Sequence, residues 1–185
     1  MATRYDGRGR VGNRCGAMPR GRGAREGPRV LASAVGDTRL EIMNVAFSAN
    51  VPHNAALGLE MIAAGPDGVE MRMPWSPDLV GNPETGVIHG GAVTSMVDAA
   101  CGAAVFLALV PPRPIATLDL RIDHLRQATA RMDVICRATC ERITTHIAFV
   151  RAVAYQGDPD APFAMVAATF MIFREGQVRP DGSMG

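Results

Sequence analysis

The fold of this chain is decided by the stretch Asn82-Pro-Glu-Thr-Gly-Val-Ile-His-Gly-Gly-Ala-Val-Thr-Ser-Met-Val-Asp-Ala-Ala-Cys-Gly-Ala-Ala-Val-Phe-Leu-Ala-Leu-Val110. A loop rich in Pro and Gly leads into His89, Gly90 and Gly91. A long apolar segment follows, in which Asp98 is the one acid. A helix that is apolar on all sides is normally buried. We therefore expect a long central helix that the rest of the chain encloses.

A membrane-spanning helix is the alternative interpretation of this segment. Its uninterrupted apolar part, residues 99–110, is shorter than the roughly 20 residues that cross a bilayer. The length favours a core helix, and we expect no membrane partner.

The two glycines stand where this helix should begin. Because glycine has no Cβ, the backbone N–H groups of Gly90 and Gly91 can come close to a ligand. The first N–H groups of a helix have no partner within it and carry the positive end of its dipole. This arrangement suits a carbonyl oxygen that gathers negative charge during acyl transfer. A strand-to-helix turn that simply requires glycine is the alternative.

Asp98 is a candidate for the functional site because an acid in an apolar helix is costly unless it is paired or used. It lies eight residues beyond Gly90, which is about 12 Å along a helix axis. A carboxylate at that distance cannot easily act on a carbon whose oxygen is held at the start of its own helix. The spacing therefore suggests a dimer in which two copies of the chain share each site.

Two phrases of the sequence resemble the hotdog-fold acyl-CoA thioesterases, most closely the branch of the phenylacetic-acid pathway (PaaI-like) thioesterases. One phrase is Leu79-Val-Gly-Asn-Pro-Glu-Thr-Gly-Val-Ile-His-Gly-Gly91, with Asp98 nine residues after the His; the other is Ala116-Thr-Leu-Asp-Leu-Arg-Ile-Asp-His-Leu-Arg126. The resemblance covers roughly Val51 to Phe173. It implies an antiparallel sheet wrapped around one long helix.

Local patterns indicate the individual elements. Residues 52–60 are expected to form a short helix and residues 75–85 a loop rich in Pro. Val69, Met71 and Met73 alternate with polar residues, and so do Leu118, Leu120 and Ile122, so each set should lie on one apolar face of a strand. The order of the expected elements, two strands, a long helix and then a run of strands, independently indicates an α+β fold.

The resemblance also implies roles for individual residues. Gly90 and Gly91 would polarise the thioester carbonyl, and His89 would shape this oxyanion end of the site. Asp98 would act either as general base toward water or as a nucleophile that forms a mixed anhydride. Thr117 would orient the water or the acid, although threonine is also common in strands for other reasons.

Three further residues are candidates with simpler alternatives. Asn82 could hold the water or the carbonyl, but the family pattern places an Asn six residues before the His and here the separation is seven. Asn82 could equally belong to a turn with Pro83, and Glu84 could replace it as a polar contact. Arg126 is a candidate for the phosphates of coenzyme A, because arginine binds phosphate well.

The net charge of +1 hides a basic N-terminus. Residues 1–39 hold nine Arg against three acids and lack apolar periodicity. We expect a disordered tail at residues 1–40, a single domain at 41–176 and a flexible tail at 177–185. Such a disordered extension could result from a start codon placed too early, with Met43 as the true start. A basic arm that contacts nucleic acid and an organelle transit peptide are the alternatives. The disordered extension is preferred, and we expect no nucleic-acid partner.

The four cysteines form no metal-binding or disulfide pattern. No secretory signal is evident, so a reduced, cytoplasmic protein is expected. Cys101, inside the expected helix, should be a packing residue. His53, His124 and His146 are not grouped with acids at metal-ligand spacing. We expect no metal and no cofactor other than the coenzyme A of the substrate.

The sequence as a whole predicts an acyl-CoA thioester hydrolase that assembles as a homodimer or a dimer of dimers (homotetramer). A non-catalytic acyl-CoA-binding or regulatory hotdog protein is the main alternative, and a hotdog hydratase or dehydratase is a third. The acyl group is not identified by the sequence.

Overall fold

Residues 35–174 are described by the computed structural model, with side chains from residue 38 onward. The elements in chain order are α1 (Val35–Asn44), the π-helical turn η1 (Val45–Ala49), α2 (Pro52–Ala56), β1 (Glu60–Gly65), β2 (Gly68–Met73), the 3-10 turn η2 (Pro77–Leu79), β3 (Val80–Asn82), β4 (Val87–Ile88), α3 (Gly90–Ala108), β5 (Ile115–His124), β6 (Val134–Ile143), β7 (Ile147–Tyr155) and β8 (Ala164–Ile172). Most of the residues expected to form the two tails lie outside the described range. The helix α1 begins at Val35, within the stretch 1–40 that the sequence assigns to the N-terminal tail.

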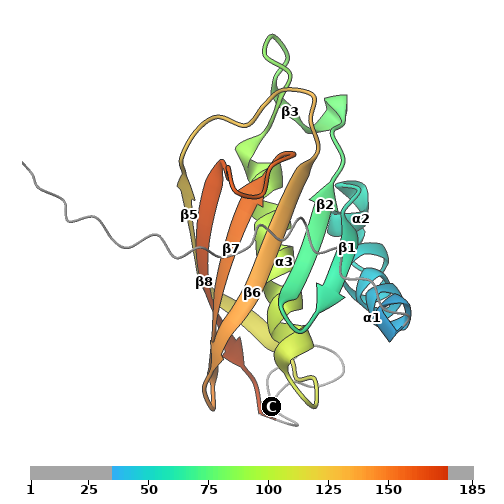
Figure 1. The fold of residues 1–185 in the computed structure, drawn as a ribbon, viewed down its shortest axis with the longest axis vertical. Helices are drawn as coiled ribbons and strands as arrows, with labels where there is room; N and C mark the ends of the chain where they lie inside the picture. The colour runs from blue at the N-terminus through green and yellow to red at the C-terminus, as the bar shows by residue number, and fades with distance from the viewer. Residues whose placement is uncertain (1–34, 175–185) are drawn as a thin grey trace, which may run out of the picture. The chain divides into compact units, whose positions relative to one another are not determined.

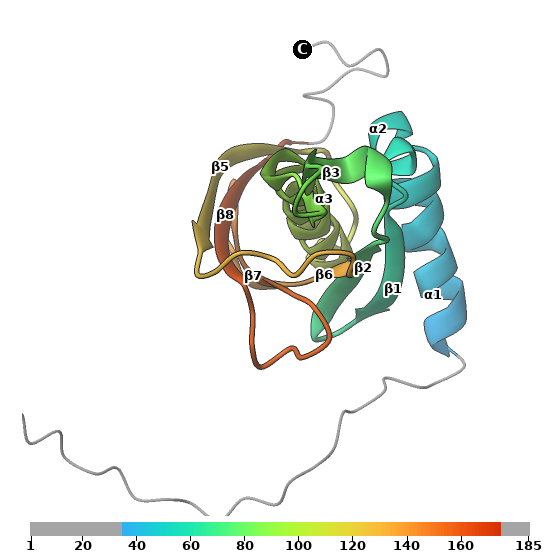
Figure 2. The ribbon, with the colours of Figure 1, turned by 90° about the horizontal axis from the view of Figure 1, so that it is seen from above.

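Six strands form one antiparallel sheet in the order β1-β2-β6-β7-β8-β5. The sheet curls around α3, which runs along its concave side (Figures 1 and 2). The prediction of an α+β hotdog fold, with an antiparallel sheet wrapped around one long helix, is confirmed. The strands β1 and β5 form the two edges of this sheet.

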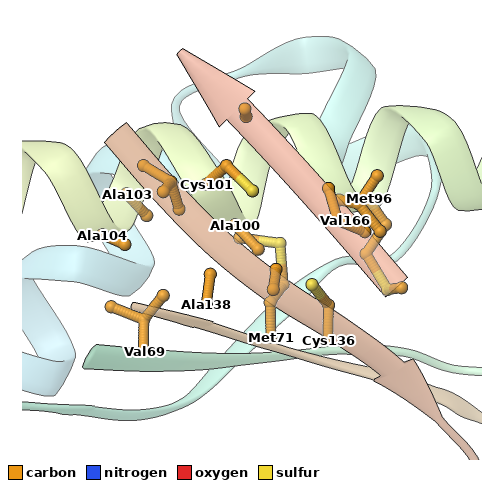
Figure 3. Packing of buried hydrophobic residues seen from close by; sticks show 14 of the residues in the cluster. Val69, Met71, Met96, Ala100, Cys101, Ala103, Ala104, Cys136, Ala138 and Val166 are labelled. Atoms are coloured by element: carbon orange, nitrogen blue, oxygen red, sulfur yellow. The ribbon is translucent and has the colours of Figure 1, made fainter. Parts of the chain in front are cut away.

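Alternating apolar residues place the core between the sheet and α3. On β2, Val69, Met71 and Met73 are buried, as their period of two predicts. They pair with Ala138, Cys136 and Val134 of β6, which are also buried. Figure 3 shows these two strands packed beneath α3, whose facing residues are mostly small: Ala100, Cys101, Ala103 and Ala104. Small side chains let the helix lie close to the sheet.

The helix α3 is only partly enclosed. It is long and apolar enough to cross a membrane by length and composition alone, and half of it is buried inside the domain. Thr94 is exposed, and Ser95 and Asp98 are half-buried. Gly91, Ser95 and Asp98 are spaced so that they fall on one face of a helix. These three residues belong to the part of α3 that is not fully buried.

The two edges of the sheet differ. At β1, the side chain of Asn44 donates to the carbonyl oxygen of Met61 and accepts from the Met61 N–H, both at 2.7 Å, so α1 covers this edge. At the other edge, β5 pairs with β8 on one side only. Unpaired edge strands are natural pairing sites for another chain.

The strand β5 contains a bulge that the sequence did not predict. Thr117 pairs with Phe170 and Asp119 with Thr169, so Leu118 is an extra residue without a partner on β8. The alternation had placed Leu118 on the same apolar face as Leu120. That prediction is wrong for Leu118, which is 51% exposed. The bulge changes which residues face inward: Thr117 before it and Leu120 after it.

Two smaller segments also differ from expectation. The helix predicted over residues 52–60 ends at Ala56, and Glu60 already belongs to β1. The loop predicted over residues 75–85 instead contains η2 and the first strand of the hairpin that β3 and β4 form.

Candidate active site

The start of α3 is shaped by His89, which precedes its first residue. The backbone of His89 is extended, and its Nδ1 accepts a hydrogen bond from the Gly91 N–H at 2.9 Å. Its own N–H donates to the Leu79 carbonyl oxygen at 2.8 Å. His89 therefore acts as the N-cap, satisfying one of the otherwise unpaired donors of the helix. In a neutral ring that accepts at Nδ1, the proton is on Nε2.

The glycines around His89 have different environments. A Cβ at Gly81 would lie 3.0 Å from the Cα of His89, and one at Gly91 would lie 2.9 Å from its Nδ1. These two glycines make room for the histidine. A Cβ at Gly90 would meet nothing within 4 Å, so packing within the chain does not explain this glycine. No acceptor for the Gly90 N–H is found among residues 35–174.

Asp98 forms the second part of the site, in the middle of α3. Its Oδ1 accepts a hydrogen bond from the hydroxyl of Thr117 at 2.9 Å. Thr117 lies on the open edge strand β5, immediately before the bulge at Leu118. The bulge lets Thr117 face α3 and reach the carboxylate. Asp98 is half-buried rather than fully buried, and so it remains accessible from the uncovered side of the helix.

A hydrogen-bonded pair lies between these two parts. The Ser95 hydroxyl donates to the Gly91 carbonyl oxygen at 3.2 Å, and His53 Nε2 of α2 lies 3.2 Å from the same hydroxyl. The neighbouring Thr94 makes the same kind of bond, to the Gly90 carbonyl oxygen at 3.0 Å, without a histidine partner. His53 thus links α2 to the first turns of α3.

Asn82 and Glu84 lie in the β3–β4 hairpin. The Asn82 Oδ1 accepts from the Glu84 N–H at 3.0 Å, and the Asn82 carbonyl oxygen accepts from the N–H groups of Thr85 and Gly86. This is the geometry of a tight turn. The hairpin is anchored by Trp75, whose Nε1 donates to the Gly86 carbonyl oxygen at 3.0 Å. The alternative interpretation of Asn82 as a turn residue accounts for every hydrogen bond that its side chain makes in the structure.

A cavity of about 320 Å³ opens beside Gly90. It is lined by Val87, Ile88, Gly90, Val93, His124, Leu125, Arg126, Gln127, Ala128 and Phe163. The structure thus brings Arg126 to the same cavity as Gly90, whereas neither Asp98 nor Thr117 lines it. His124 also lines the cavity and was not among the predicted site residues. After the bulge, the inward alternation of Leu120 and Ile122 continues to His124, but the bulge itself was not predictable from that pattern.

The cysteines of the core are unsuited to nucleophilic catalysis. Burial, with a smaller contribution from the nearby Asp98 carboxylate, raises the pKa of the Cys101 thiol to about 12. Burial also raises the pKa of Cys136 well above its usual value. Within the described part of the chain, no group of three His, Cys, Asp or Glu could hold a metal ion.

Residues 85–162 match the thioesterase superfamily. A Halobacterium salinarum protein whose name describes an esterase is 33% identical over 64% of this chain and 83% of its own length. The medium/long-chain acyl-CoA thioesterase YigI of Escherichia coli K12 is 25% identical over 72% of this chain and 93% of its own.

Solved structures show the same fold. A crystal structure of a Pseudomonas aeruginosa protein is 40% identical and superposes with a TM-score of 0.66 over 72% of this chain and 99% of that one. The phenylacetic acid degradation protein PaaI of E. coli has a TM-score of 0.63 at 16% identity, covering 74% of this chain and 95% of its own. At that identity, the likeness to PaaI concerns the fold alone.

Proposed function

Because this chain belongs to the thioesterase superfamily and has the hotdog fold, we propose that it hydrolyses acyl-CoA thioesters to a free acid and coenzyme A. The observation that carries the proposal is the free Gly90 N–H at the start of α3, beside a cavity and with open space where a side chain would be. A backbone donor at a helix N-terminus can stabilise the oxygen of a tetrahedral intermediate.

The proposed reaction uses both parts of the site. The thioester carbonyl oxygen accepts from the Gly90 N–H, and His89 shapes this end of the site by capping α3. Gly91 contributes by holding His89 in place, since its own N–H is bonded to Nδ1. Asp98, oriented by the Thr117 hydroxyl, either takes a proton from the attacking water or attacks the carbonyl carbon itself.

Either route breaks the carbon–sulfur bond and balances with one water. If Asp98 is the base, the water oxygen bonds to the carbonyl carbon, the thiolate of coenzyme A leaves, and the proton taken by Asp98 passes to that thiolate. If Asp98 is the nucleophile, a mixed anhydride forms first and water then cleaves it. Both routes need the carboxylate near a carbonyl held by Gly90.

The distance between the two parts favours a shared site. Gly90 and Asp98 belong to one helix and are separated by about 12 Å along its axis. The β5 edge is open while the β1 edge is covered by Asn44, and Thr117 and Asp98 lie at the open edge. We infer a homodimer that pairs along β5, so that Asp98 of one copy works with the Gly90 N–H of the other.

The remaining predicted residues have supporting roles in this proposal. Arg126 lies at the cavity beside Gly90, which suits a contact with the phosphates of coenzyme A as the substrate enters. Asn82 and Glu84 would act through the hairpin that precedes α3. A dimer of dimers would leave this arrangement unchanged.

The test is a thiol-release assay on a panel of acyl-CoAs with variants mixed in one dimer. Asp98→Asn and Gly90→Val are each expected to be almost inactive. Co-expressed with different affinity tags and purified through both, the two variants should regain activity, because each mixed dimer has one site with an intact Asp98 and an intact Gly90.

If the wild type is active and the mixed dimers are not, the shared site is contradicted, while the proposal of a hydrolase still holds. No thiol release from any acyl-CoA, with binding intact, would instead favour the non-catalytic acyl-CoA-binding protein.

A further inference from the structure

The cavity beside Gly90 has an apolar floor. Three of its lining residues are buried, namely Ile88, Val93 and Phe163, and each comes from a different part of the chain: β4, α3 and the segment just before β8. Val87 and Ala128 line it from half-buried positions. All five are hydrocarbon side chains, so the interior offers no side-chain hydrogen-bonding group.

The mouth of the cavity is mostly polar. Gly90, His124, Arg126 and Gln127 are exposed there, together with the apolar side chain of Leu125. The Arg126 guanidinium donates to the Ala161 carbonyl oxygen at 2.8 Å and to that of Gln127 at 3.4 Å, which holds the charge at the rim. The His124 ring has no hydrogen-bond partner among residues 35–174. Donors at the rim and hydrocarbon at the floor are the usual arrangement of a small-molecule pocket.

The geometry points to this cavity as the acyl pocket of the site: the carbonyl is held at Gly90, the acyl group reaches the floor at Val93 and Phe163, and the pantetheine arm leaves through the polar mouth. This inference rests on the proposed hydrolase function. The pantetheine arm is the less suitable occupant, because its amide groups would lose their hydrogen bonds to water against the apolar floor. An acyl chain has no hydrogen bonds to lose, and the burial of its hydrocarbon surface is favourable.

The volume of the cavity sets the class of acyl group. The cavity offers about 320 Å³ and is open to solvent at its mouth. We expect it to hold a medium acyl chain or an arylacyl group, and longer chains to extend out of it. We expect kcat/KM to rise along the series from butanoyl-CoA, by up to about fourfold for each buried methylene, and to stop rising near decanoyl-CoA.

The experiment measures kcat/KM on saturated acyl-CoAs from butanoyl to hexadecanoyl for two variants of opposite effect. Ala128→Phe fills the cavity from a half-buried position in the loop after β5 and should move the preferred acyl group to a shorter chain. Val87→Ala enlarges the cavity and should move the preference to a longer one. Ala49→Phe places the same bulky group at an exposed position in η1, outside the cavity, and should leave the preference unchanged.

Each result decides the inference. Opposite shifts in Ala128→Phe and Val87→Ala confirm the acyl pocket, and either shift alone supports it if the other variant does not fold. A rise in KM that is equal for all chain lengths would assign the cavity to the pantetheine arm. An unchanged profile in both folded variants would place the acyl group elsewhere.

A failure of the proposed hydrolase function can be distinguished from a failure of the acyl-pocket inference. If the wild type released no thiol, the affinities of the same acyl-CoAs would be measured by calorimetry. A dependence of affinity on chain length that shifts in the two variants would still confirm the pocket, while the absence of hydrolysis would overturn only the reaction.

Discussion

The first turn of α3 and its middle carry the two halves of the candidate site in different ways. At the first turn, neighbours in sequence arrange the donors: His89 caps the helix by accepting from Gly91, and Gly90 is left open. In the middle, Asp98 depends on Thr117, which lies 19 residues further along the chain and reaches it across the fold. One half is a local structure and the other a tertiary one.

This difference has a mechanistic meaning. The first turn offers backbone groups, whose positions follow from the helix itself. The middle offers a reactive carboxylate, whose position relies on a single hydroxyl from an edge strand. The two halves should therefore respond differently to substitution, and the following variants test that expectation in order of decreasing effect on hydrolysis.

The largest effect is expected for Asp98→Asn. Loss of the reacting carboxylate should lower kcat on the order of 10²–10⁴-fold with the fold intact. Asp67→Asn is the matched control, since Asp67 is an exposed acid in the turn between β1 and β2, at the edge of the sheet opposite β5. Steady-state kinetics on the best acyl-CoA provide the measurement. Equal losses in both variants would show that Asp98 has no special role.

Gly91→Ala should come next and should act through His89. The added Cβ would lie 2.9 Å from Nδ1, so the ring must move and the cap is lost. We expect kcat to fall about 10–100-fold through the misplaced donors, and the free energy of unfolding to fall by about 1 kcal/mol. In Gly90→Ala the added Cβ meets nothing, so this variant should be at least as stable as the wild type in urea denaturation. A Gly90→Ala variant as unstable as Gly91→Ala would contradict this account of the first turn.

Thr117→Val tests the tertiary half. Removing the hydroxyl leaves the Asp98 carboxylate without its 2.9 Å donor while keeping the shape of the side chain. Because the lost hydrogen bond is made to a carboxylate at an accessible position, kcat should fall about tenfold. Thr169→Val on β8, on the outward face opposite Asp119, should leave kcat unchanged. An unaltered rate in Thr117→Val would mean that Asp98 is positioned by other groups.

Ser95→Ala should have a smaller effect, of about two- to fivefold in kcat. It removes the hydroxyl that joins His53 to the first turn, whereas Thr94→Ala removes an equivalent intrahelical bond that has no histidine partner. The double variant with Ser95→Ala and His53→Ala should lower kcat no more than either change alone, because both changes remove the same contact. Additive losses would mean that the two residues act independently.

The smallest effect on hydrolysis is expected at Cys101, one helical turn beyond Asp98 on the buried side. With its pKa raised to about 12, the thiol stays protonated at neutral pH. Iodoacetamide at pH 8 should therefore leave Cys101 unmodified in the native protein, as intact and peptide mass spectrometry can show. Alkylation of Cys101 with loss of activity would contradict its assignment as a packing residue.

The same shift has a consequence for stability at alkaline pH. The folded pKa lies above the ordinary value of 9.0, so the native state holds its proton where the unfolded chain has released it. The stabilisation that this provides is fully present below pH 9 and is lost as the pH rises toward about 12. Replacing Cys101 with Ala should flatten the alkaline decline measured by urea denaturation, more than replacing the half-buried Cys140 does.

Much of this molecule could be predicted from local patterns. The apolar run after His89-Gly90-Gly91 indicated α3, the alternation of Val69, Met71 and Met73 indicated β2, and the order of elements indicated a sheet around a helix. Each of these patterns lies within a single helix or strand, and the burial of that element alone accounts for it. The position of Asp98 on α3, and hence its separation from Gly90, followed from the same helix.

The tertiary structure alone decided which residues of distant elements meet. By simple alternation Thr117 would share the outward face of β5 with Asp119, away from α3. The bulge at Leu118 reverses this, because two residues of β5 oppose one of β8, and only pairing between strands can create it. In the same way, the cavity joins Gly90 to His124 and Arg126, which no spacing in the sequence relates. The sequence by itself determined the helix α3, its backbone donors and Asp98, through short-range periodicity and capping. The curvature and register of the sheet determined which residues, such as Thr117 and Arg126, lie close to them.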